Sequence, residues 1–264
     1  ILEPGDVICL NDPYRGGTHL PDITLISPVH LEEEKELLGY VASRAHHSDV
    51  GGMSPGSMPL AREIYQEGLR IPPVQLYRRG KLEAGVWNLI LANVRTPIER
   101  AGDLDAQLGA LHAGTSRLLE IVERRGARET LSAMTNLARY ADRLVAAGLE
   151  HIAPGTYKAD DLMDDDGFGT VDVPLHVELR KHKDGLDVDF TGSSRQVLGP
   201  LNARLSAARA CVYYVCKAVI DPDLPACAGA YRSVEVYAPE GSILQATYPA
   251  AIGNANILTD QRVV

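Results

Sequence analysis

The sequence predicts an α+β fold that is mixed and strand-rich, with helical blocks. Residues 1–95 and 152–264 have the composition of strands joined by loops rich in proline and glycine. Residues 96–151 instead carry leucines at three- and four-residue steps, the period of an amphipathic helix. Strands therefore dominate and the helices fall in blocks. A chain of 264 residues can bury a substantial core, as one large domain or two smaller ones.

A β-hairpin is expected early in the first block. Residues 22–30 are rich in β-branched side chains, residues 31–36 form a polar turn, and residues 37–45 are apolar again. With the turn centred near Glu33 and Glu34, the numbers of paired residues sum to about 67, across roughly 5 Å of sheet.

This register brings two histidine-bearing segments to one end of the hairpin. It places His19 opposite Ser48, between His47 and Asp49. Because neighbouring strand residues point to opposite faces, His46 and His47 are not expected to line one cavity. We therefore predict a metal site of His19, His46 and Asp49, with Asp22 as a further ligand or as a residue that orients one. Two imidazoles and a carboxylate suit Mn, Zn or Fe(II). The alternative is a cluster of hydrogen-bonded polar groups in a tight turn.

The later elements follow from simpler signals. Gly126 separates two expected helices within residues 97–151. Residues 176–190 predict a hairpin with Asp184 and Gly185 at its turn, and a helix is expected over residues 203–219. Residues 225–264 are expected to be strand and loop.

Six segments, in the same order from the first residues to the last, resemble the hydantoinase B/5-oxoprolinase family. They are NDPYRGGTHLPD (Asn11 to Asp22), AHHSDVGGMSPGSMP (Ala45 to Pro59), RTPIERAGDLDAQ (Arg95 to Gln107), PGTYKADDLMDDDG (Pro154 to Gly167), DFTGSSRQVLGPLN (Asp189 to Asn202) and YPAAIGN (Tyr248 to Asn254). Full chains of that family are longer. The resemblance therefore implies a partial hydantoinase B-like catalytic domain, with a complete processed domain as the alternative.

The resemblance also implies an activity. The family includes a component of ATP-dependent N-methylhydantoin amidohydrolases, the C-terminal half of 5-oxoprolinase and a large subunit of acetone carboxylase. The acetone carboxylase subunit holds Mn(II), and its motifs are matched at His19, His46 and Asp49. We expect the hydrolytic component of an ATP-dependent cyclic amidase that opens a hydantoin or 5-oxoproline ring. ATP would be bound by a hydantoinase A-like partner, and His47 or Asp22 would act as general base or orient a ligand. Two alternatives are an acetone carboxylase-type subunit and a non-catalytic assembly partner.

Composition limits the other classes of partner. The net charge of −9, without a compensating lysine and arginine patch, argues against nucleic acid and anionic membrane surfaces. No apolar run approaches the roughly 20 residues that span a bilayer. The four cysteines show no CxxC spacing and are expected to be free thiols in a reducing cytoplasm.

Overall fold

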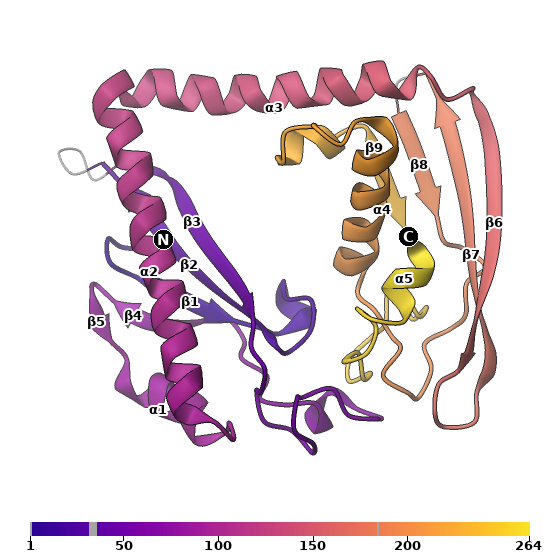
Figure 1. The fold of residues 1–264 in the computed structure, drawn as a ribbon, viewed down its shortest axis with the longest axis horizontal. Coiled ribbons are helices and arrows are strands. Elements are labelled where there is room, and N and C mark those ends of the chain that lie inside the picture. Colours follow the sequence, from indigo (N-terminus) through magenta and orange to yellow (C-terminus); the bar gives the residue numbers. More distant parts are fainter. Residues whose placement is uncertain (1, 32–35, 184) are drawn as a thin grey trace. The chain divides into compact units, whose positions relative to one another are not determined.

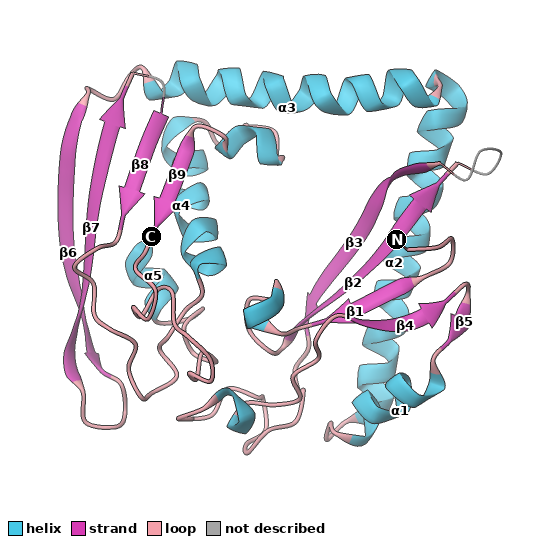
Figure 2. Cartoon of the chain, turned by 180° about the vertical axis from the view of Figure 1, so that it is seen from behind, coloured by secondary structure: helices cyan, strands magenta, loops and turns pink. Residues whose placement is uncertain are grey.

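The structure is a computed structural model that describes residues 2–31, 36–183 and 185–264. The chain divides into two compact units, which are described separately. Unit 1 comprises residues 1–59 and 65–131, and unit 2 comprises residues 60–64 and 132–264. These units differ from the predicted blocks, which divide at residues 95 and 151. The predicted α+β class is confirmed, since both units combine a sheet with helices (Figures 1 and 2).

Unit 1 is an antiparallel sheet with the strand order β3-β2-β1-β4-β5. Its strands are β1 (Val7–Leu10), β2 (Asp22–His30), β3 (Leu37–His46), β4 (Val74–Arg78) and β5 (Lys81–Leu82). Its helices are α1 (Ala84–Ala92), α2 (Pro97–Arg125) and the short 3₁₀ turns η1 (Pro13–Arg15) and η2 (Ile64–Gln66), of which the last begins in unit 2.

The predicted hairpin is confirmed as β2 and β3, but its register differs by one residue. The pairs from Asp22 with His46 to Val29 with Gly39 sum to 68, and an irregularity between Val29 and His30 shifts the last pair. The predicted turn residues Glu33 and Glu34 lie outside the described residues. Pairing ends at Asp22, so His19 lies in the loop before β2 and the prediction that it stands opposite Ser48 was wrong.

Helix α2 covers one face of this hairpin (Figure 1). Leu104, Leu108 and Leu111 of α2 are buried, as are Ile23 and Leu25 of β2. These strand positions are odd-numbered, so Asp22 and its partner His46 belong to the other face. The sheet thus leaves one face for the core and one for the candidate site.

Helix α1 was not predicted within the strand-rich block. Its sequence, AGVWNLILA, is apolar on almost every side and shows no helical period. The helical block is confirmed as α2 and α3 (Ala127–Leu149), which meet at Gly126. No described helix is long and apolar enough to cross a membrane.

Unit 2 has a four-stranded sheet in the order β6-β7-β8-β9, in which β8 and β9 are parallel. The strands are β6 (Gly155–Asp165), β7 (Val171–His182), β8 (Gly185–Asp189) and β9 (Val234–Tyr237). The helices are α4 (Leu205–Ile220), α5 (Thr259–Val263) and the 3₁₀ turn η3 (Ala228–Tyr231). The core lies between the sheet and α4, and includes Val188, Ala208, Val212 and Val236.

The helix predicted over residues 203–219 is confirmed as α4, and the second hairpin as β7 and β8. Of its predicted turn residues, Asp184 lies outside the described residues. Helix α5 was not predicted, because five residues are too few to show a period.

Candidate metal centre

Three side chains bring their ligand atoms together at one end of the hairpin. His19 lies in the loop before β2, Asp22 is the first residue of β2, and His46 is the last residue of β3. Nε2 of His19 lies 3.1 Å from Oδ1 of Asp22 and 3.2 Å from Nδ1 of His46. Nδ1 of His46 is also 3.2 Å from the same Asp22 oxygen. The three atoms therefore form a nearly equilateral triangle.

The size of this triangle fits a shared metal ion. Two ligand atoms bound at about 2.1 Å, with an angle of about 90–109° at the metal, lie roughly 3.0–3.4 Å apart. All three separations fall in that range. Two imidazole nitrogens and one carboxylate oxygen suit Mn, Zn or Fe(II), whereas Ca²⁺ prefers a shell of oxygen atoms. Among the described residues this is the one group of at least three acidic, histidine or cysteine side chains with metal-binding geometry.

Asp22 is held as a charged, oriented carboxylate. Its Oδ2 accepts a hydrogen bond from Oγ1 of Thr18, while Oδ1 faces the two imidazoles. Burial raises the pKa of Asp22, but hydrogen bonds from His19 and Thr18 and the charges of His19 and His46 outweigh it. The pKa falls from 3.8 to about 2. The hydrogen bond from Thr18 to Oδ2 thus fixes the direction in which Oδ1 faces the two histidines.

The two imidazoles differ in exposure. The His19 side chain is 3% exposed, whereas that of His46 is 50% exposed. Nδ1 of His19 is buried without a hydrogen-bond partner in the part of the chain that the structure describes. The polar contacts of this buried ring are therefore made through Nε2, toward the other two ligand atoms. The site is closed on the His19 side and accessible on the His46 side.

The first glycine-rich motif shapes the loop that carries His19. The buried Asn11 amide donates hydrogen bonds to the carbonyl oxygens of Leu20 and Leu69, and its Oδ1 accepts one from the N–H of Ile71. At Gly17 a Cβ atom would lie only 2.2 Å from the Asn11 carbonyl oxygen. This close approach requires glycine.

His47 lies on the opposite face from His46, as predicted for neighbouring residues. Its Nε2 is 2.9 Å from Oε1 of Gln107 on α2. The Gln107 amide nitrogen donates to the carbonyl oxygens of Ile23 and Ser43, so its Oε1 accepts a hydrogen bond from the Nε2–H of His47. Burial lowers the pKa of His47. Of the two roles considered for His47, this position favours orienting its neighbours over acting as a general base.

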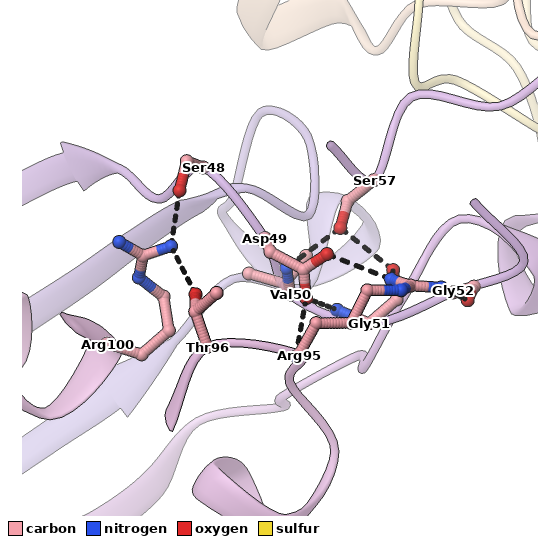
Figure 3. Close-up of polar contacts among 9 residues, drawn as sticks. All are labelled: Ser48, Asp49, Val50, Gly51, Gly52, Ser57, Arg95, Thr96 and Arg100. Carbon is pink, nitrogen blue, oxygen red and sulfur yellow. Dashed lines mark hydrogen bonds and ion pairs between the residues drawn. The ribbon is translucent and has the colours of Figure 1, made fainter. Parts of the chain in front are cut away.

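Asp49 does not join the group, contrary to the predicted ligand set. Its Oδ1 accepts hydrogen bonds from the backbone N–H groups of Gly51 and Arg95, both at 3.0 Å. Its Oδ2 lies 2.8 Å from Nη1 of Arg95, which also donates to the Gly51 carbonyl, while Nη2 donates to Gly52 (Figure 3). The 7% exposed Asp49 carboxylate is thus engaged by its own loop and by Arg95. Asp22, which the sequence suggested as a further ligand or as a residue that orients one, lies with the two histidines instead.

Arg100 fixes the same loop from the first turn of α2. Its Nη1 donates to Oγ of Ser48 and to Oγ1 of Thr96 (Figure 3). Its Nε and Nη2 contact Oδ2 of Asp103 at 2.9 and 2.7 Å. The loop that follows His46 is therefore attached to the helix on the far side of the sheet.

Sequence reasoning gave no role to Arg95, Arg100 or Gln107. A signal was present for two of them. Arg100 and Gln107 are seven residues apart, so they lie on one face of α2, the face that also carries the buried Leu104, Leu108 and Leu111. Polar residues on an apolar helical stripe indicate buried hydrogen bonds.

The sequence matches the model of the family described as Hydantoinase B/oxoprolinase over residues 1–264. The chain belongs to the Hydantoinase B/oxoprolinase family. The family resemblance inferred from the six motifs is confirmed.

Relatives within the Hydantoinase B/oxoprolinase family are longer than this chain. An uncharacterized protein of Methanocaldococcus jannaschii is 40% identical over 264 residues, which is all of this chain and 46% of that protein. The 5-oxoprolinase of Saccharomyces cerevisiae is 32% identical over 99% of this chain and 21% of its own length. The chain thus spans about half or less of these relatives.

Two solved structures share the fold of this Hydantoinase B/oxoprolinase chain. The ATP-dependent caprolactamase of Pseudomonas jessenii superposes with a TM-score of 0.89 at 30% identity, covering 99% of this chain and 45% of that chain. A nucleotide-free acetone carboxylase superposes with a TM-score of 0.86 at 21% identity, covering 97% of this chain and 35% of that chain. The second similarity concerns the fold alone.

Proposed function

We propose that this chain carries the metal centre of an ATP-dependent cyclic amidase, in which it serves the hydrolytic half of the reaction. The observation that supports this most directly is the triangle formed by His19, Asp22 and His46, with one histidine half exposed. The family includes proteins named 5-oxoprolinase and caprolactamase, both of which act on cyclic amides. In the proposed reaction this chain would contribute a metal site that the substrate can reach from the exposed side of His46.

A cyclic amide resists hydrolysis for two reasons. Its carbonyl is stabilised by resonance, and its amine is a poor leaving group. In the proposed reaction, ATP transfers a phosphoryl group to the amide oxygen, which gives an imidate-like intermediate whose carbon accepts water. The ring C–N bond of this adduct then breaks as the amine is protonated, which leaves an acyl phosphate, and a second water converts the acyl phosphate to the carboxylate and inorganic phosphate.

The metal ion would be held by Nε2 of His19, Oδ1 of Asp22 and Nδ1 of His46. A divalent ion such as Mn, Zn or Fe(II) lowers the pKa of bound water and stabilises negative charge on oxygen. Thr18 keeps the Asp22 carboxylate oriented, and His47 holds the end of β3 against α2 through Gln107. The exposed side of His46 leaves room for the substrate.

We assign ATP binding to a hydantoinase A-like partner, fused or separate. The sequence contains no P-loop, and its glycine-rich stretches carry aspartate and histidine where a phosphate-binding loop has lysine. A hydantoin or 5-oxoproline is the proposed substrate class. The protein named caprolactamase subunit beta, 34% identical over 94% of this chain, extends that class to larger lactams.

The test is ring opening by the full-length protein that contains this chain. Product from 5-oxoproline or a hydantoin is measured with and without ATP, a hydantoinase A-like component and added Mn²⁺. We expect turnover only when ATP and the partner are both present. His46→Ala should lower kcat/KM at least about 100-fold, while Arg117→Ala, a change on the exposed side of α2, should leave it unchanged. Turnover without ATP and partner, or acetone carboxylation in place of ring opening, would contradict the proposal.

A further inference from the structure

We propose that Arg44 forms an oxyanion-binding subsite beside the candidate metal centre, an inference that rests on the proposed function. In the hairpin register Arg44 pairs with Thr24, and His46 pairs with Asp22. Residues two apart on a strand share a face and lie roughly 7 Å apart. Arg44 is therefore the next exposed residue along the face that carries the metal ligands.

The guanidinium of Arg44 is fixed along one edge. Nε donates to Oγ1 of Thr24 at 2.9 Å, and Nη2 donates to the carbonyl oxygen of Gly16 at 3.3 Å. Gly16 lies three residues before His19 in the same loop, so the guanidinium is held by the segment that also carries a proposed metal ligand. Because the side chain is already held in place, binding of an anion costs less conformational entropy.

The opposite edge of the guanidinium remains available. Nη1, and the second N–H of Nη2, have no ion pair or hydrogen bond with any described residue. Arg95 and Arg100, by contrast, each contact an aspartate. An exposed arginine without a carboxylate partner is notable in a chain with 35 acidic and 26 basic residues. Two parallel N–H groups match the paired oxygens of a carboxylate or a phosphoryl group.

The proposed reaction presents such a group in two forms. One is the carboxylate carried by a substrate such as 5-oxoproline, and the other is the phosphoryl group of the activated amide. Both are oxyanions, and both would lie within the length of one small molecule from the metal ligands. Arg44 would hold either one and so position the reacting carbon at the open side of His46.

Calorimetric titration of the full-length protein with inorganic phosphate and with 5-oxoproline, in the absence of ATP, tests this subsite. Arg44→Met removes the charge but keeps an aliphatic chain, and should weaken oxyanion binding at least tenfold while metal content stays unchanged. Arg44→Lys should give an intermediate loss because a lysine lacks the two-point geometry. Arg117→Met, an exposed arginine on α2 paired with Glu120, is the matched control and should bind like the wild type.

Steady-state kinetics with ATP and the partner then distinguish the two oxyanions. An increase in KM in Arg44→Met that is confined to 5-oxoproline, and absent with the neutral 2-pyrrolidone, identifies the substrate carboxylate. An equal loss of kcat with both identifies the phosphoryl group. Unchanged oxyanion binding in Arg44→Met would overturn the inference. A loss of oxyanion binding that is accompanied by an equal loss of bound metal would also overturn it. Phosphate binding through Arg44 in a protein that binds no metal would retain the subsite and reject the proposed function.

Discussion

Two polar clusters lie at the end of the same hairpin, and each contains one aspartate. The candidate metal centre consists of His19, Asp22 and His46. The loop clamp, as we name it, consists of Ser48, Asp49, Arg95, Thr96 and Arg100 (Figure 3). In the loop clamp the aspartate faces an arginine and backbone N–H groups. In the metal centre the aspartate oxygen faces two imidazole nitrogens.

From this difference we infer that the loop clamp has a structural role and the candidate metal centre a functional one. Each oxygen of Asp49 is matched by a donor of this chain, so the loop clamp is complete in itself and stabilises the fold. Nε2 of His19, Oδ1 of Asp22 and Nδ1 of His46 can all donate an electron pair toward a single point. One cation can bind all three atoms at once, whereas one proton cannot. Mutations in the candidate metal centre should therefore mainly change metal affinity, and mutations in the loop clamp should mainly change folding stability.

Metal affinity should give the largest contrast. Asp22→Asn keeps the side-chain shape but removes the charge of a proposed ligand, so the affinity for Mn²⁺ or Zn²⁺ should fall at least about 100-fold. Asp49→Asn should change it by less than about threefold. Competition with a chelator measures both constants. A larger loss in Asp49→Asn than in Asp22→Asn would reverse the assignment of the two clusters.

Folding stability should give the opposite contrast. Asp49→Ala leaves Arg95 and two backbone N–H groups without their acceptor, which should cost about 2–4 kcal/mol. Asp22→Ala in the metal-free protein should cost about 1 kcal/mol or less, since Asp22 is partly exposed and flanked by histidines. Denaturant unfolding followed by circular dichroism compares the two. Equal losses would show that both clusters are structural.

The acid dependence of stability should give the smallest effect. Burial raises the pKa of Asp49, but hydrogen bonds from the N–H groups of Arg95 and Gly51 and from the Arg95 guanidinium outweigh it and lower the pKa below 3.8. A lowered folded-state pKa means that this contribution is fully present above about pH 4 and is lost as the pH falls through the folded-state value. The stability difference between wild type and Asp49→Asn should therefore shrink below pH 4. A difference that stayed constant to pH 2 would contradict this assignment.

The hairpin and the long helices could be predicted because their signals are local. β-Branched residues on both sides of a polar turn identify β2 and β3, and leucines at helical spacing identify α2 and α3. The register could not be predicted to one residue, because the irregularity between Val29 and His30 shifts the pairing without a sequence signal. His19 lies in a loop because the pairing of β2 with β3 ends at Asp22, at the opposite end of the hairpin.

The choice between the two aspartates lay beyond the sequence for a different reason. His19 and Asp22 are three residues apart, and so are His46 and Asp49. Spacing alone makes the two pairs equivalent. What separates them is Arg95, which is 46 residues from Asp49 along the chain and reaches it only in the folded structure. The sequence predicted the two histidines that the fold brings together, and the fold places Asp22 rather than Asp49 beside them.

The central claim is that His19, Asp22 and His46 together hold one divalent transition metal. A crystal structure of the metal-loaded full-length protein, with anomalous diffraction recorded at the absorption edge of the metal, tests it most directly. We expect a single peak in this region, about 2.0–2.3 Å from Nε2 of His19, Oδ1 of Asp22 and Nδ1 of His46. Asp49 should remain on Arg95. A peak bonded to Asp49, or none near the three ligand atoms of a protein that retains its metal, would contradict the claim.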